Sequence, residues 1–140
     1  MVTLKLKANL DSAGEAMDFV EAQLERYGFA DGLQPEILIA VEEIFVNIAS
    51  YAYGAEEKGD VILSVAIDEK VLIRFEDNGE PFNPLESADP DFNLPIMERK
   101  IGGLGINFVK NMMDEIDYSY TGGKNILTIA KDVFSPDGVS

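Results

Sequence analysis

Two pairs of short apolar segments, each joined by a few polar residues, constrain the fold of this chain most strongly. The segments are rich in β-branched and aromatic residues, as is typical of strands. Asp68-Glu69-Lys70 connects the first pair, and Thr121-Gly122-Gly123-Lys124 connects the second. Each pair therefore predicts an antiparallel β-hairpin. The four predicted strands are residues 61–67, 71–75, 116–120 and 125–131.

One further strand and three helices are predicted from the remaining patterns. Residues 2–7 alternate apolar and polar side chains, which indicates a half-buried strand at the edge of an antiparallel sheet. The capping box Ser12-x-x-Glu15 predicts the start of a first helix that stops at Gly28. A second helix is expected from Pro35 to about Tyr53-Gly54, and a third from Leu104 to about Glu115.

These elements fit a single domain. A chain of 140 residues that is 46% hydrophobic is close to the usual size of one domain. Strands at the beginning, middle and end, interleaved with three helices, predict an α+β fold. We expect a two-layer α/β sandwich, in which a mixed, mostly antiparallel sheet is covered on one face by three helices. The domain should span residues 1–132, and residues 133–140 should form a flexible tail.

The charge and the missing residue types exclude several functions. The chain has 26 acidic and 11 basic residues and a net charge of -15, so we expect no direct binding to nucleic acid. It has no cysteine and no histidine, which excludes disulfides, iron–sulfur clusters, His- or Cys-ligated metals and Ser–His–Asp triads. No apolar run approaches the roughly 18 residues of a membrane span, and the N-terminus lacks a signal-peptide pattern. We therefore expect a cytoplasmic protein with no membrane partner.

A long segment without periodicity separates the first hairpin from the third helix. It runs from Asp77 to about Gly103 and contains four prolines. A loop of this length in a small domain is usually functional or mobile. We expect residues 86–102 to form a lid.

Glu43 and Asn47 are the first candidate functional pair. They are four residues apart on the second predicted helix, so their side chains share one face. The carboxylate could hold a hydroxyl or a water while the amide oxygen binds a hard cation such as Mg²⁺. An isolated pair of this kind is more often a solvent-facing polar stripe.

Two glycine-containing segments are the other candidates. Asp77, followed by Gly79, ends a strand, where a carboxylate could accept a hydrogen bond from the amino group of a base and Gly79 would let a flat ring approach. Gly102-Gly103-Leu104-Gly105 opens a helix, where free N–H groups could bind a phosphate beside Arg99 and Lys100. Taken alone, the first segment is more often a plain turn, and the second is as often a helix cap.

The order of these motifs resembles that of the GHKL ATPase superfamily, which has the Bergerat nucleotide-binding fold. Glu-x-x-x-Asn on a helix, Asp-x-Gly after a hairpin strand, a long loop, Gly-Gly-Leu-Gly and a terminal hairpin follow one another between about residues 5 and 131. Within the superfamily, the chain is most similar to the bacterial anti-sigma-factor serine/threonine kinases. Their Gly-Leu-Gly-x-x-x-Val/Ile-x-x-x-Met-Asp-Glu pattern matches residues 103–115.

The resemblance implies a role for each candidate residue. Glu43 would be the general base and Asn47 the Mg²⁺ ligand. Asp77 would bind the adenine amino group beside Gly79. The cofactor contacts would be completed by Arg99, Lys100, Gly103, Leu104, Gly105 and Asn125.

The chain also departs from the family pattern. Many relatives carry a histidine where this chain has Tyr51 and an arginine where it has Ile101, and Lys124-Asn125 replaces a Gly-Thr pair.

The function implied by the resemblance is Mg²⁺- and ATP-dependent regulation of transcription. The protein would bind ATP or ADP, phosphorylate a serine or threonine of a STAS-domain anti-anti-sigma protein, and sequester a sigma factor, as a homodimer. One alternative is a protein-binding module that is gated by ATP or ADP and has no kinase turnover. Another is an α+β interaction domain that binds no nucleotide.

Overall fold

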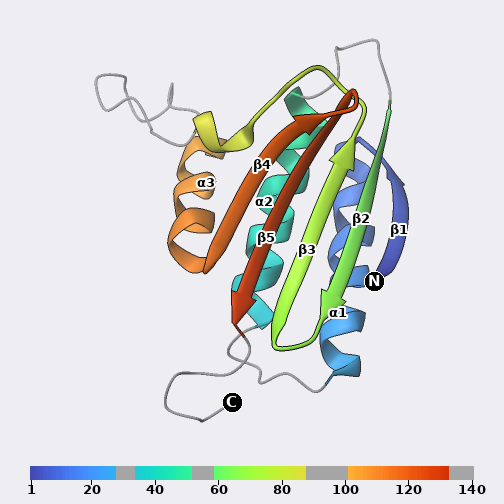
Figure 1. The fold of residues 1–140 in the computed structure, drawn as a ribbon, viewed down its shortest axis with the longest axis vertical. Helices are drawn as coiled ribbons and strands as arrows, with labels where there is room; N and C mark the ends of the chain where they lie inside the picture. Colours follow the sequence, from blue (N-terminus) through green and yellow to red (C-terminus); the bar gives the residue numbers. More distant parts are fainter. Residues whose placement is uncertain (28–33, 52–58, 88–100, 133–140) are drawn as a thin grey trace.

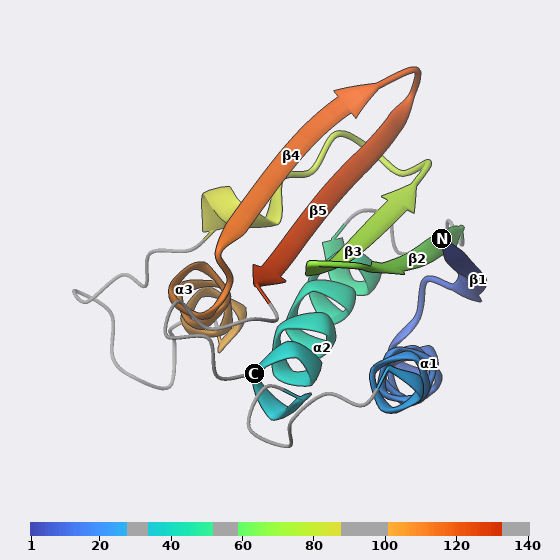
Figure 2. The same ribbon diagram turned by 60° about the horizontal axis from the view of Figure 1, so that its bottom comes forward.

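The computed structural model describes residues 1–27, 34–51, 59–87 and 101–132. Five strands form one sheet in the order β1-β2-β3-β5-β4. Three helices cover one face of this sheet (Figures 1 and 2). The strands are β1 (Val2–Lys7), β2 (Asp60–Ile67), β3 (Lys70–Asp77), β4 (Glu115–Thr121) and β5 (Lys124–Asp132), and the helices are α1 (Ala13–Arg26), α2 (Gln34–Tyr51) and α3 (Ile101–Met112).

The α+β two-layer architecture predicted from the sequence is confirmed, and so are both hairpins and the edge position of β1. The sheet differs from the prediction in one respect. All four pairings among the described strands are antiparallel, so the mixed sheet does not occur there. The reason is that β3 and β4, which run in the same direction, are separated by β5, which pairs with both of them. Residues 133–140, predicted to be a flexible tail, lie outside the described residues.

The core lies between the inner face of the sheet and α2. Leu63, Phe75 and Leu127 lie opposite one another across β2, β3 and β5, and each is at most 2% exposed. Helix α2 contributes the facing side chains at helical spacing, because its apolar residues recur every three or four positions. These buried residues of α2 are Ile37, Ala40, Val41, Ile44, Phe45 and Ile48.

Helix α1 begins differently from the predicted capping box. Ser12 is the residue before the helix, but its side chain makes no capping hydrogen bond. A short 3-10 turn, η1 (Leu10–Ser12), precedes α1, and the Asn9 side chain caps it by accepting hydrogen bonds from the N–H and the hydroxyl of Ser12. The capping box is therefore wrong, because Ser12 is itself in a helical backbone conformation and Asn9 takes the capping position. Helix α1 ends at Arg26, whereas the predicted stop, Gly28, lies outside the described residues.

Helix α3 begins and ends three residues earlier than predicted, at Ile101 and Met112. Glycine is a weak helix former, and Gly102 and Gly103 were expected just before the helix, whereas they lie in its first turn. The lid was predicted for residues 86–102. Its first residues belong to a second 3-10 turn, η2 (Pro84–Ser87), its last two residues belong to α3, and residues 88–100 lie outside the described residues. Among the described helices, none is long and apolar enough to cross a membrane.

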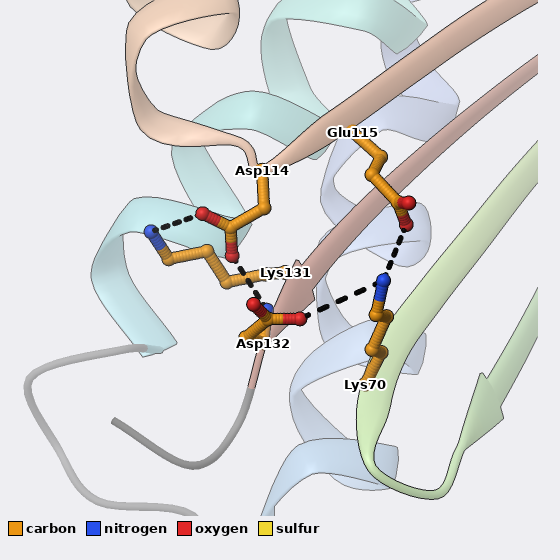
Figure 3. Close-up of polar contacts among 5 residues, drawn as sticks. All are labelled: Lys70, Asp114, Glu115, Lys131 and Asp132. Atoms are coloured by element: carbon orange, nitrogen blue, oxygen red, sulfur yellow. Dashed lines mark hydrogen bonds and ion pairs between the residues drawn. The ribbon is translucent and has the colours of Figure 1, made fainter. Parts of the chain in front are cut away.

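A charged cluster joins α3 to the sheet at the end where β5 finishes (Figure 3). The Lys131 ammonium donates to the backbone carbonyl of Met112 at 2.7 Å, at the last residue of α3. Asp114, just after the helix, accepts a 2.6 Å hydrogen bond from the backbone N–H of Asp132. Lys70 pairs with Glu115 at 2.9 Å. A cation on the final carbonyls of a helix satisfies acceptors that have no partner within the helix, so the cluster fixes the C-terminal end of α3.

Candidate nucleotide site

The candidate residues gather toward one end of the molecule. Strand β3 finishes there at Asp77, which lies opposite Asn125 at the start of β5. The C-terminal end of α2 and the N-terminal end of α3 point to the same end of the sheet (Figure 1). Helix α3 and η2 both pack against α2. The fold thus brings the three sequence motifs to one region.

Glu43 and Asn47 lie on one face of α2 and are bonded to each other. The Asn47 amide nitrogen donates to the Glu43 carboxylate at 2.9 Å and to the Glu43 backbone carbonyl at 2.8 Å. Glu43 is half-buried, whereas Asn47 is 1% exposed. Burial raises the pKa of the Glu43 carboxyl, against the hydrogen bond from Asn47, which lowers it. The pair is therefore not the exposed polar stripe that an isolated motif more often represents, because its amide is buried and its carboxylate is made more basic.

The amide oxygen of Asn47 has no hydrogen-bond partner in the described part of the chain, although it is buried. Its orientation is set by the two hydrogen bonds of the nitrogen, so the oxygen points away from Glu43. An unsatisfied buried acceptor costs about 1–3 kcal/mol, and a ligand that supplied a donor or a cation would remove this cost. Within the described residues, no group of three acidic side chains could hold a metal by itself. A hard cation held by one amide oxygen and by groups of a ligand fits this arrangement.

Asp77 is a buried carboxylate at the end of a strand. It is 4% exposed, and its Oδ1 accepts hydrogen bonds of 2.9 Å from the backbone N–H of Gly79 and from the Asn125 amide. Burial raises the pKa of Asp77, while these two hydrogen bonds lower it. A carboxylate fixed in this way can accept an N–H from a flat polar ligand.

Asn125 is the centre of a hydrogen-bond network. Its amide nitrogen donates to Asp77 and, at 2.8 Å, to the carbonyl of Glu80. Its amide oxygen accepts from the N–H of Phe82 at 2.9 Å and from the Tyr118 hydroxyl. Asn125 was predicted to be a cofactor contact, whereas the structure shows that protein groups already use its whole side chain.

Tyr118 was missed by sequence reasoning, although a signal was present. In the hairpin, Asn125 is opposite Tyr120, and Tyr118 is two residues before Tyr120 in β4. Side chains two residues apart on a strand share a face, so the register of the hairpin alone places Tyr118 diagonally across from Asn125. The remaining predicted contacts are less defined: Gly103, Leu104 and Gly105 lie in the first turns of α3, and Arg99 and Lys100 lie outside the described residues.

Comparisons with known proteins agree with this fold. A family model described as the histidine kinase-like ATPase domain matches residues 6–131. A curated protein of Listeria monocytogenes, the serine-protein kinase RsbW, is 26% identical over 131 residues, which cover 90% of this chain and 83% of the relative. The serine-protein kinase RsbW of Bacillus mycoides is 30% identical over 107 residues, covering 73% of this chain and 66% of the relative.

Solved structures show a similar fold. A crystal structure of the RsbU and RsbW domains of a Mycobacterium tuberculosis protein superposes with a TM-score of 0.64 at 15% identity. The match covers 100% of this chain but 35% of that chain. The Acinetobacter baumannii histidine kinase AdeS matches with a TM-score of 0.51 at 13% identity, over 96% of this chain and 69% of that one.

Proposed function

Because this chain belongs to the histidine kinase-like ATPase domain family, we propose that it is an anti-sigma factor and ATP-dependent protein serine/threonine kinase. The observation that carries the proposal is the Glu43–Asn47 pair on α2. Its carboxylate has a raised pKa and its buried amide oxygen has no partner in the described part of the chain. The curated relatives named as serine-protein kinases add support, since they match most of the chain.

Recognition of the nucleotide is assigned to Asp77 and Gly79. Among the described residues, the two hydrogen bonds that hold the Asp77 carboxylate both meet Oδ1, and we assign Oδ2 to a ligand. That oxygen can accept an N–H from the 6-amino group of adenine, and Gly79 offers no side chain that would obstruct the ring. The N–H groups in the first turn of α3, where Gly103 lies, are assigned to the phosphates, because the first four N–H groups of a helix have no partner within it. Gly105, in the next turn, would shape this end of the helix.

Phosphoryl transfer is assigned to the groups of α2. Mg²⁺, when bound, would neutralise charge on the phosphates, and the amide oxygen of Asn47 would be its protein ligand. Glu43 would orient the acceptor hydroxyl. The hydroxyl oxygen forms a bond to the γ-phosphorus while the bond between that phosphorus and the bridging oxygen of ADP breaks, and Glu43 accepts the hydroxyl proton. A raised pKa makes Glu43 a better proton acceptor. No step of this scheme requires a histidine.

The partners follow from the resemblance to the anti-sigma-factor kinases. We assign the acceptor hydroxyl to a serine or threonine of a STAS-domain anti-anti-sigma protein, and the sequestered partner to a sigma factor. The protein would bind both partners in the cytoplasm. The net charge of -15 is consistent with protein partners rather than with direct nucleic-acid binding.

The test is a transfer assay with purified STAS-domain proteins from the same organism, with labelled ATP and Mg²⁺. We expect label on one serine or threonine of the acceptor, and loss of this label with Glu43→Gln. Nucleotide binding without transfer to any acceptor would favour a module that is gated by ATP or ADP. Absence of nucleotide binding would overturn the proposal.

A further inference from the structure

The side chain of Asn125 has no hydrogen-bonding capacity left for a ligand. A side-chain amide has two donor hydrogens and two acceptor lone pairs. The donors meet Asp77 and the Glu80 carbonyl, and the acceptors meet the Phe82 N–H and the Tyr118 hydroxyl. Asn125 is 3% exposed, so water does not compete for these contacts. Any effect of Asn125 on a ligand must therefore pass through the residues that it holds.

The groups around Asn125 that can only accept or only donate decide which way its amide faces. If the amide were turned over, its oxygen would face the Asp77 carboxylate and its nitrogen would face the Tyr118 hydroxyl and the Phe82 N–H. The amide oxygen would then meet the Asp77 carboxylate and the Glu80 carbonyl, which only accept, in a buried site where each unmet group is costly. The amide nitrogen would meet the Phe82 N–H, which only donates. The Tyr118 hydroxyl can donate or accept, so it does not choose this orientation, but its hydrogen bond to Oδ1 holds the amide in place. Burial raises the pKa of the Tyr118 hydroxyl, which keeps it protonated as a donor.

The direction of the amide sets the direction of the Asp77 carboxylate. Asn125 and the Gly79 N–H both bind Oδ1 at 2.9 Å. With one oxygen held by two donors, rotation of the carboxylate is restricted and the other oxygen has a fixed orientation. The same amide also binds Glu80 and Phe82, so the turn that carries Gly79 is tied to the same point.

We propose that Tyr118 and Asn125 are positioning residues. They orient the Asp77 carboxylate so that it accepts a hydrogen bond from the 6-amino group of a purine nucleotide. The inference rests on the proposed function, because it assumes that Asp77 faces the base. It goes beyond that function by assigning base selectivity to a hydroxyl on the edge strand β4. The affinity of a ligand that lacks the amino group should not depend on the orientation of Asp77.

Other charged residues line a cavity next to Asp77. This cavity has a volume of about 90 Å³ and lies on the side of β1 and β2. These charges are unaltered in the variants below, so they act equally in every comparison. The charged residues that line this cavity with Asp77 are Lys5, Asp60, Glu76 and Lys124.

The test compares two nucleotides in isothermal titration calorimetry. ADP and purine riboside 5′-diphosphate differ only in the 6-amino group. The ratio of their dissociation constants therefore measures how strongly the protein prefers a base that carries this group. Tyr118→Phe removes one hydroxyl and keeps the ring. Tyr120→Phe is the matched control, since Tyr120 lies on the same strand, is 45% exposed and is not the tyrosine that binds Asn125.

We expect Tyr118→Phe to weaken ADP binding about two- to tenfold, as for the loss of one hydrogen bond, and to leave binding of the analogue unchanged. The preference for ADP should fall by the same factor, whereas Tyr120→Phe should leave both affinities unaltered. Asn125→Asp should lower the preference further. It should also move the acidic limit of ADP binding to higher pH, because it removes a hydrogen bond that lowers the pKa of Asp77 and adds a like charge.

The outcomes separate the two proposals. If Tyr118→Phe weakens both nucleotides equally, or leaves the preference for ADP unchanged, the positioning role is overturned while nucleotide binding stands. If the unsubstituted chain binds ADP and the analogue equally, Asp77 does not read the amino group and the inference is again overturned. If the unsubstituted chain binds neither, the proposed function itself fails.

Discussion

Replacing Glu43 by glutamine should separate stability from catalysis. Glutamine keeps the shape of the side chain and keeps an oxygen that can accept the 2.9 Å hydrogen bond from Asn47. It removes the negative charge, whose burial is the main reason that the pKa of Glu43 is raised. A raised carboxyl pKa means that the folded protein binds the proton more tightly than the unfolded chain does, so the ionised carboxylate weakens the fold at neutral pH.

The sign and size of the effect follow from this linkage. Below the unfolded pKa of about 4.5, the side chain is neutral in both states and costs nothing. The penalty develops as the pH rises through the raised folded pKa, and is complete above it. A tenfold difference in proton affinity between the folded and unfolded states corresponds to about 1.4 kcal/mol. Because water screens the partly exposed Glu43, the penalty is smaller than for a fully buried carboxylate, and we expect the glutamine variant to be more stable than the unsubstituted chain at pH 7. The phosphoryl-transfer rate should fall by roughly 10²–10⁴-fold.

The assay is urea unfolding of both proteins at several values between pH 4 and pH 8, together with the transfer assay at pH 7. The difference in unfolding free energy should be smallest at pH 4 and reach a plateau near neutral pH. Glu21→Gln is the control, because it removes the same charge from an exposed position on α1, is not among the groups that shift the pKa of Glu43, and should leave the rate unaltered. A glutamine variant that is less stable at pH 7, or one that transfers phosphate at the normal rate, would refute the reasoning.

Three further predictions concern single contacts. Asp77→Asn should weaken ADP binding by about 1–3 kcal/mol in calorimetry, and an unchanged affinity would move base recognition to another residue. Asn47→Ala should remove the contribution of Mg²⁺ to nucleotide affinity, because it deletes a buried amide oxygen that lacks a partner among the described residues; equal losses in Mg²⁺ and in EDTA would make Asn47 a structural residue. Lys131→Met should lower the unfolding free energy by about 1–2 kcal/mol and speed hydrogen exchange at the end of α3, because the Met112 carbonyl loses its donor; unchanged exchange there would contradict the anchoring role of the lysine.

Local patterns were sufficient to predict most of the fold. The terminal hairpin followed from apolar runs on either side of two glycines, and Gly122 and Gly123 do adopt the positive φ angles, 61° and 77°, that a tight turn of this kind requires. The start of α1 could not be obtained in this way. Asn9 and Ser12 both favour capping positions, and the choice between them depends on the 3-10 turn that the packed structure adopts.

The candidate site was predictable only where it is local. Glu43 and Asn47 are one helical turn apart, so their spacing alone places them together. The Asp77–Asn125 hydrogen bond joins residues 48 positions apart, and it depends on the pairing of β3 with β5. No pattern within either strand specifies that register. The contact of Tyr118 with Asn125 follows from the register of the terminal hairpin, whereas its connection to Asp77 depends on the pairing of β3 with β5.

The order of the strands also has a consequence for how the chain folds. The hairpins β2–β3 and β4–β5 are local and can form on a timescale of about microseconds. The pairing of β3 with β5 joins Lys70 to Asp132, and that of β1 with β2 joins Val2 to Val65. Closing loops of this length costs entropy before any contact repays it. During synthesis, β1 emerges first but has no partner until β2 has been made. We therefore expect slow folding for a chain of this size, with the first strand to be synthesised among the last to join the sheet.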